Sequence, residues 1–152
     1  MNLNDRPEVH DKADYEADFT LWLEAQLLLL RERQFDKLDL DNLFEEVGGI
    51  LRSERREVRS RLDLIVVHLL KCQYQPQRKS KSWLATLRTQ RTRLGRVLQD
   101  SPSLRRHILD FAHENYRGSV EQAAEQTGLA RAIFPAALPY SEEQLLDADF
   151  VP

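Results

Sequence analysis

The chain has 152 residues, of which 41% are apolar and 31% are charged, and its formal net charge at pH 7 is −3. This balance excludes an intrinsically disordered chain, and the scarcity of Gly and Pro, five and six residues, favours helix over sheet. The single cysteine excludes an internal disulfide, and neither a secretory signal nor a membrane-spanning apolar run is present, so we expect a cytoplasmic protein.

The charges are distributed unevenly along the chain. Residues 1–70 carry 10 Lys or Arg against 16 Asp or Glu, and residues 107–152 carry 2 against 8. Residues 71–106 carry 10 basic residues against Asp100 alone. The basic middle has two interpretations. It packs against the chain's own acidic helices, which the negative net charge favours, or it binds the phosphates of a nucleic acid.

Two long helices are predicted first. Asp14 is expected to cap a helix that runs to about Arg33, and apolar residues on nearly all its sides predict that it is buried. Asp41 is expected to cap a second helix that runs to about Tyr74, with a bend or close contact at Gly48–Gly49. Residues 1–13 are expected to form an N-terminal tail, and residues 14–152 a single helical-bundle domain.

The second half of the chain continues the helical pattern. A third helix is predicted from Ser80 or Ser82 to Gln99, and Ser101 with Pro102 starts a fourth. Gly118 is expected to divide that fourth helix, and Gly128 to end it. An extended segment then precedes a last short helix. Because no stretch alternates apolar and polar residues as a strand would, the predicted fold is all-α, a bundle of four main helices with a short C-terminal helix.

Polar residues interrupt the apolar seam of the second helix. Glu54, Arg61 and His68 are seven residues apart and therefore share one side of the helix, and Glu57 lies one turn before Arg61. The favoured interpretation is a paired polar layer that sets the packing of the helix. The alternative is a pocket in which Glu54 and His68 act as acid, base or ligands.

Other patterns typical of catalysis or metal binding are missing. Ile65 occupies the position at which a Glu-x-x-His metal pair before His68 would need an acid. Gly49 stands where the acidic motif begun by Glu45–Glu46 would need its next carboxylate, and Cys72 falls on the packed seam. We therefore expect no metal and no cofactor, and the chain is more consistent with a binding protein than with an enzyme.

A basic segment follows the second helix. Arg78, Lys79, Lys81, Arg88 and Arg91 are the candidate residues for binding a nucleic acid or a protein partner. The aromatic residues Tyr74 and Trp83 lie among them and could stack on bases, but the start of an apolar stripe at Trp83 favours packing in the core.

A series of segments resembles the bacterial DUF29 family. In order along the chain these segments are DNLFEEV, RSERREVRSRLDLIVVHLLKCQYQP, SKSWLATLRTQR, DSPSLRR, TGL with FP, and DADFVP. The resemblance runs from about Asp14 to Pro152 and implies a small all-helical protein, but no catalytic residue. Cys72, where the family commonly has Trp, and the Gly48–Gly49 pair depart from the pattern, and both concern packing.

The leading hypothesis is a non-catalytic cytoplasmic protein-interaction or regulatory module that does not bind membranes. Its partner is expected to be a protein, and a homodimer through the long second helix is one option. The first alternative is a nucleic-acid-binding protein that uses residues 78–96. The second alternative is an enzyme that uses the polar layer around His68.

Overall fold

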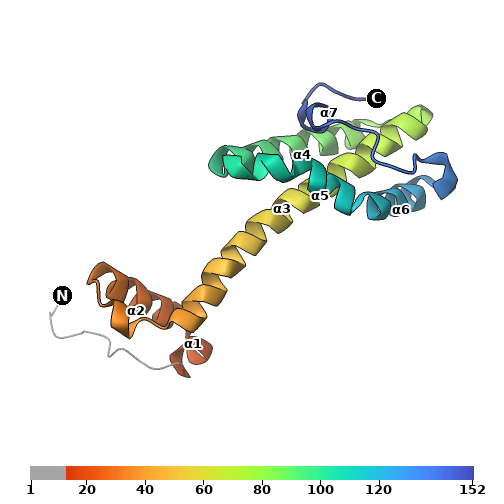
Figure 1. Cartoon of the computed structure of the whole chain (residues 1–152). Coiled ribbons are helices and arrows are strands. Elements are labelled where there is room, and N and C mark those ends of the chain that lie inside the picture. Colours follow the sequence, from red (N-terminus) through yellow and green to blue (C-terminus); the bar gives the residue numbers. More distant parts are fainter. Residues whose placement is uncertain (1–12) are drawn as a thin grey trace. The chain divides into compact units, whose positions relative to one another are not determined.

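The computed structural model describes residues 13–152, and helices are the regular secondary structure of this part of the chain (Figure 1). These residues contain no strand, so the predicted all-α class is confirmed. The α-helices are α1 (Ala13–Ala17), α2 (Phe19–Arg31), α3 (Leu40–Tyr74), α4 (Lys81–Asp100), α5 (Ile108–Glu114), α6 (Tyr116–Thr127) and α7 (Glu142–Leu146). Four short 3-10 helices accompany them: η1 (Phe35–Lys37), η2 (Pro76–Arg78), η3 (Pro102–His107) and η4 (Arg131–Ile133).

The chain divides into two compact units. The N-terminal unit ends at Arg52, and the C-terminal unit runs from Ser53 to Pro152. Helix α3 contributes residues to both units. A single domain over residues 14–152 stays a prediction, and the predicted tail of residues 1–13 lies outside the described residues except for Ala13.

The first predicted helix is two helices. Asp18 has an extended backbone, with φ −148° and ψ 93°, and its carboxylate accepts a hydrogen bond from the Leu21 N–H at 3.0 Å. This carboxylate caps α2 and separates it from α1. The predicted cap at Asp14 with an uninterrupted helix is therefore wrong, because a second aspartate four residues later supplies the N-cap.

Helix α3 begins earlier than predicted. The Asp39 carboxylate accepts from the Asn42 N–H at 3.4 Å, and the Asp39 carbonyl accepts from the Leu43 N–H at 2.9 Å. Asp39, and not Asp41, therefore caps α3. The helix continues without interruption past Gly48–Gly49 to Tyr74, where Pro76 follows.

The hydrophobic core lies in the C-terminal unit. The second part of α3 contributes fully buried residues such as Leu62, Ile65 and Leu69, and α4 contributes Leu87 and Leu94. In Figure 1, α4, α5 and α6 lie along this part of α3, and α7 lies against α4. The predicted start of α4 is confirmed, since the Ser80 hydroxyl accepts from the Trp83 N–H at 3.2 Å.

The connections after α4 differ in part from the prediction. Residues Pro102–His107 form a 3-10 helix before α5, and the break that follows lies at Asn115, while Gly118 is inside α6. Gly128 ends α6 in the left-handed region with φ 74°, as predicted. The last short helix is also confirmed, with a capping box between Ser141 and Gln144.

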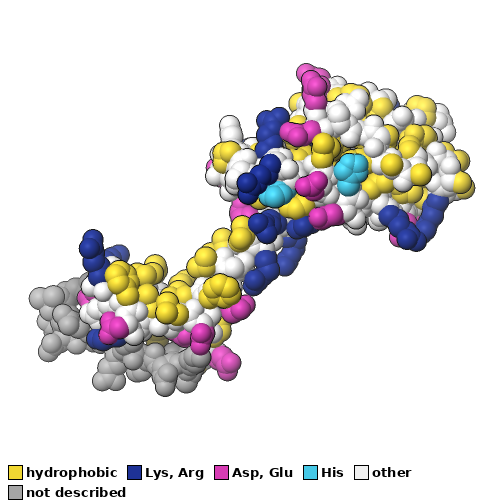
Figure 2. All heavy atoms as spheres, in the orientation of Figure 1, with side chains coloured by type: hydrophobic (Ala, Val, Ile, Leu, Met, Phe, Trp, Pro, Cys, Tyr) yellow, Lys and Arg dark blue, Asp and Glu magenta, His cyan; other side chains and the backbone are white. Residues whose placement is uncertain are grey.

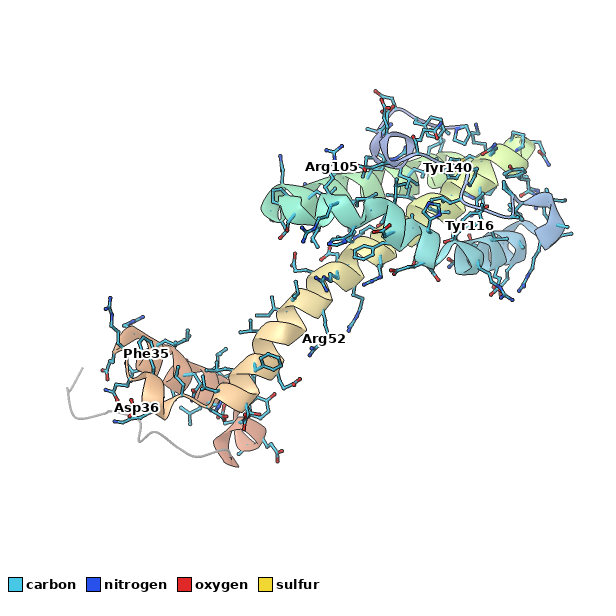
Figure 3. The ribbon with its side chains drawn as sticks, in the orientation of Figure 1. Phe35, Asp36, Arg52, Arg105, Tyr116 and Tyr140 are labelled. Atoms are coloured by element: carbon cyan, nitrogen blue, oxygen red, sulfur yellow. The ribbon has the colours of Figure 1, made fainter. Side chains whose placement is uncertain are left out.

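Two buried tyrosines hold the extended segment that precedes α7 (Figure 3). The Tyr116 hydroxyl donates to the Pro135 carbonyl at 2.9 Å, and the Tyr140 hydroxyl donates to the Gln73 side chain at 2.8 Å. Burial raises the pKa of Tyr116 to about 12 and also raises the pKa of Tyr140. Both hydroxyls therefore act as neutral hydrogen-bond donors that fix this segment to the core.

Candidate functional site

Exposed apolar side chains gather in the N-terminal unit, where they are visible as yellow surface in Figure 2. Of the thirteen large apolar residues that are exposed in the described chain, ten lie between residues 19 and 51. They are Phe19, Leu21, Leu27, Leu30, Phe35, Leu40, Phe44, Val47, Ile50 and Leu51. Contiguous exposed apolar surface is uncommon on monomeric proteins and marks sites of interaction.

One face of α3 carries the most exposed of these residues. Leu40, Phe44, Val47 and Leu51 follow one another at intervals of four, three and four residues and share one side of the helix, with Ile50 beside them. We call these five residues the α3 stripe. Phe44 is 77% exposed. Val47 and Ile50 are 63% and 66% exposed.

Helix α2 exposes apolar residues as well, so the prediction of a buried helix is wrong. Its buried residues are Trp22, Gln26 and Leu29, on one side. Phe19, Leu27 and Leu30 occupy a neighbouring side and remain exposed. The apolar arc of α2 is therefore wider than the surface that covers it. A signal in the sequence was available, because a helix that is apolar nearly all round needs neighbours on nearly all sides.

Polar contacts join α1 and α2 to the first part of α3. The Trp22 Nε1–H donates to the Asp39 carboxylate at 3.2 Å, and the Gln26 side-chain oxygen accepts from the Asp39 N–H at 2.8 Å. The Tyr15 hydroxyl donates to the Glu46 carboxylate, and this hydrogen bond raises the pKa of Tyr15. Tyr15 therefore ties α1 to the first turns of α3, and Trp22 and Gln26 tie α2 to Asp39, the residue that caps α3.

Charge changes sign along the part of α3 that bears the stripe. Glu45 and Glu46 come first, and Arg52, Arg55 and Arg56 follow. Arg52 folds back over Gly48 to reach Glu45, with a nitrogen–oxygen distance of 3.6 Å between two exposed side chains. A Cβ on Gly48 would lie 3.2 Å from the Arg52 guanidinium, so the glycine leaves room for this contact. An exposed pair of this kind contributes little to stability and exchanges readily.

The predicted polar layer is only partly brought together. The Arg61 guanidinium donates to the Gln90 side chain at 3.0 Å and to the Glu57 carboxylate at 3.2 Å, which joins α3 to α4. Arg61 Nε is buried without a hydrogen-bond partner among the described residues. Glu54 is half-buried and lies outside this network.

His68 is separated from the rest of the layer. Fourteen helical residues place it about 21 Å along α3 from Glu54. It is 8% exposed, and its Nδ1 lies 2.8 Å from the Leu64 carbonyl oxygen. Burial lowers the pKa of His68, while the hydrogen bond to Leu64 opposes that shift and the nearby Lys71 adds to it. The two groups predicted to act as an acid and base do not converge.

Lys71 makes specific contacts in the core, although it was not among the predicted site residues. Its Nζ donates to the Gln126 side chain at 2.8 Å and lies 4.3 Å from the centroid of the Trp83 ring. Burial lowers the pKa of Lys71. The indole of Trp83 is half-buried and lies over this ammonium group of the same chain. This position agrees with the expected packing of Trp83. It also leaves a smaller part of the ring for stacking on nucleic-acid bases.

The basic candidates have different environments. Arg91 is 6% exposed and donates to three backbone carbonyls, of Leu145 at 3.0 Å and of Gln144 and Phe150 at 2.7 Å each. It therefore attaches the C-terminal segment to α4 and is withdrawn from the surface. The exposed candidates are Arg78, Lys79, Lys81 and Arg88. Of these, Lys79 donates to the backbone oxygen of Pro152 at 2.6 Å.

No group of three His, Cys, Asp or Glu residues within the described part of the chain is arranged to hold a metal ion. Cys72 is fully buried, and this burial raises the pKa of its thiol. A raised thiol pKa lowers the fraction of thiolate, which is the nucleophilic form. Among the described helices, none is both long and apolar enough to cross a membrane.

Comparison with known proteins gave one match. The family described as "Domain of unknown function DUF29" matches residues 15–151, which is nearly the whole chain. No curated protein and no solved structure matches the chain.

Proposed function

Because the chain belongs to the DUF29 family, whose description records no activity, its role has to be argued from the geometry, and we propose that it is a non-catalytic protein-interaction module. The observation that carries this proposal is the exposed apolar surface of the N-terminal unit, which includes the α3 stripe. We further propose that the module acts in the cytoplasm.

The physical support is the shortage of core in that unit. Trp22, Gln26 and Leu29 are its buried residues among those described, whereas ten large apolar residues are exposed. A unit of this size buries too little surface to be stable by itself, and small units are commonly completed by a disulfide, a metal or another polypeptide. Cys72 is the single cysteine of the chain and lies in the C-terminal unit, so we propose that another polypeptide completes this surface.

The arrangement of the polar residues supports a non-catalytic role. Glu57, Arg61 and Gln90 hydrogen-bond to one another, as a structural layer would. His68 faces a backbone carbonyl and a neighbouring lysine, without a carboxylate to orient it for acid–base catalysis. An enzyme built around His68 is therefore the weakest of the three hypotheses.

Site-specific photo-crosslinking in cells that naturally produce the chain tests the proposal. A photo-reactive phenylalanine analogue replaces Phe44 in one variant and Ile133 in the control, since both side chains are exposed but Ile133 lies in η4 of the C-terminal unit. We expect a crosslinked protein adduct from position 44 and none from position 133. The absence of any adduct at position 44 would overturn the proposal.

Nucleic-acid binding is the second candidate, because Arg78, Lys81 and Arg88 are exposed on the basic segment. Binding through them predicts an affinity that falls steeply with salt and weakens in Arg88→Ala. Arg91→Ala would be uninformative about phosphate contacts, since Arg91 holds backbone carbonyls. Nucleic-acid binding is tested by titrating the protein into a fluorescently labelled single strand and a labelled duplex at low salt. The absence of binding to both would exclude this function.

A further inference from the structure

We infer that the occupant of the α3 stripe is a second copy of this chain, with its α3 helix antiparallel to the first. This inference rests on the proposed function and names its partner. Three features of the first part of α3 carry it: the α3 stripe, the order of the charges, and the position of the glycines.

The apolar face of α3 suits pairing with an identical helix. The residues of the α3 stripe are 50–77% exposed. An apolar face on a helix is buried when a second helix with the same kind of face packs against it. A second copy supplies such a face and closes the assembly, because a two-fold interface uses the same surface on both chains.

The charges favour the antiparallel arrangement of the two α3 helices. Glu45 lies three residues before Gly48 and Arg52 lies three residues after Gly49, and both side chains are exposed. Antiparallel pairing brings the acidic end of each helix to the basic end of the other, whereas parallel pairing places like charges together. Unlike charges across an interface select the orientation and register of the partner.

The glycines allow two helices to approach at the centre of this segment. Gly48 and Gly49 lie between the acidic and basic ends, and Gly48 borders the stripe between Phe44 and Leu51. Among the described residues outside the local helix backbone, the atoms within 4 Å of a Cβ placed on either glycine belong to the flexible end of Arg52, on the same helix. An antiparallel pair centred here would place these glycines near each other, where the absence of side chains permits close packing of the backbones.

The exposed residues are also numerous enough for a specific dimer. A standard interface buries about 800 Å² per partner, around a core of apolar residues. The five residues of the α3 stripe, which are 50–77% exposed, provide the apolar core of such an interface. The same face would leave one chain alone with an exposed surface that invites non-specific association.

Light scattering coupled to size-exclusion chromatography, followed by sedimentation equilibrium, tests the inference on the full chain. We expect a dimer whose dissociation constant rises at least about tenfold in Ile50→Glu, because a charge would replace a contact residue in the centre of the interface. Ile133→Glu is the matched control, with the same residue replaced at an exposed site of the C-terminal unit, and should leave the constant unchanged. A chain that stays monomeric up to high concentration would overturn the inference.

A charge variant protects this test from a folding artefact. Arg52→Glu replaces an exposed charged side chain, and the helix content of the variant can be checked by circular dichroism. We expect it to weaken the dimer, and the loss should be recovered when it is mixed with a Glu45→Arg variant, since each chain then meets the opposite charge. Dimerisation that ignores both reversals would contradict the proposed pairing of charges.

Cysteine crosslinking reports the orientation. Gly48→Cys lies at the centre of the paired segment and should form an intermolecular disulfide on mild oxidation. Leu40→Cys lies near one end, so an antiparallel pair separates the two copies by about 25 Å and prevents a disulfide. Efficient crosslinking at both positions would indicate a parallel pair and overturn the arrangement. The native chain is the control, because its buried Cys72 should not react.

Mass spectrometry of the adduct formed at position 44 separates this inference from the proposed function. An adduct of twice the mass of the chain, with peptides from this chain alone, supports the second copy. An adduct with a different protein overturns the second copy but retains the interaction module. The absence of any adduct overturns both.

Discussion

The two parts of helix α3 carry the same kind of residue in opposite environments. Val58, Leu62 and Ile65, in the C-terminal unit, are 0% exposed, whereas Leu40, Phe44 and Val47, in the N-terminal unit, are 63–77% exposed. All six belong to the apolar face of one uninterrupted helix. What differs is the presence of neighbouring helices, since α4, α5 and α6 cover the second part.

This difference separates two roles of apolar surface. In the C-terminal unit the apolar face stabilises the fold by removing area from water. In the N-terminal unit the apolar face of α3 is exposed to water. The favourable free energy of burying it is therefore gained only when another molecule binds there. The following predictions test this contrast, in order of decreasing expected effect.

The largest effect should come from truncating the two parts of α3. Leu62→Ala should lower the free energy of unfolding by about 2–5 kcal/mol, because it leaves a cavity in a closed core. Leu40→Ala should change it by less than about 0.5 kcal/mol at protein concentrations where the chain is monomeric, because that side chain is already in water. Urea denaturation followed by circular dichroism measures both values.

Equal losses in the free energy of unfolding from Leu62→Ala and Leu40→Ala would contradict the proposed difference between the two parts of α3. The C-terminal unit would then not be the only source of stability, and the first part of α3 would have to be covered within one chain. Repeating the measurement over a range of protein concentrations separates covering within a chain from covering by another copy, because only the latter depends on concentration.

Arg91→Ala should produce the next largest effect within the C-terminal unit. It removes three charge-assisted hydrogen bonds and leaves the carbonyls of Gln144, Leu145 and Phe150 without their partner, at a cost of about 2–4 kcal/mol. Hydrogen exchange should show lost protection in α7. Arg88→Ala, an exposed arginine on the same helix, is the control and should have an effect within about 0.5 kcal/mol.

Removing one helix cap in each unit should have a smaller effect, and the two substitutions can be compared directly. Asp18→Ala removes the side-chain cap of α2, and Ser80→Ala removes that of α4, each at a cost of about 1 kcal/mol to its helix. In Ser80→Ala the loss should appear in global unfolding, because α4 belongs to the main core. In Asp18→Ala it should appear as faster hydrogen exchange in α2, with global unfolding unchanged. A fall in global stability for both would show that the units unfold together.

The pH dependence of His68 should give the smallest effect. Burial lowers its pKa below the usual value of 6.5, so the unfolded chain binds this proton more readily than the folded protein does. The free energy of unfolding should therefore fall as pH decreases through 6.5. His68→Gln, which does not titrate, should have a flatter profile between pH 7.5 and 5.5. An unchanged profile in this variant would show that His68 does not contribute to the slope.

Much of the helical architecture could be predicted from local signals. Ser80 and Ser141 each start a helix, Gly128 ends one, and Pro76 follows the end of α3, because caps and breakers act within one turn. The errors arose where two similar signals compete over a few residues. Asp18 caps α2 and Asp39 caps α3, whereas Asp14 and Asp41 had been predicted as the caps. The carboxylates of Asp18 and Asp39 accept hydrogen bonds from N–H groups in the first turn of each helix.

The candidate sites were less predictable, because the roles of long polar side chains depend on distant partners. Arg91 was grouped with the exposed arginines, yet it binds carbonyls more than fifty positions later. The hydrogen bond between Arg61 and Gln90 depends on how α3 packs against α4, which the spacing of residues along one helix does not indicate. Helical spacing identifies the side on which a residue lies, but it does not identify what covers that side.

The all-α class, the extent of most helices and the apolar face that runs along α3 could be predicted from the sequence, because these follow from spacing and from caps within a turn. Which part of that face is buried depends on tertiary packing, since burial requires a second element at the right distance. Helices α4, α5 and α6 lie along the second part of α3, whereas the apolar residues of its first part are exposed.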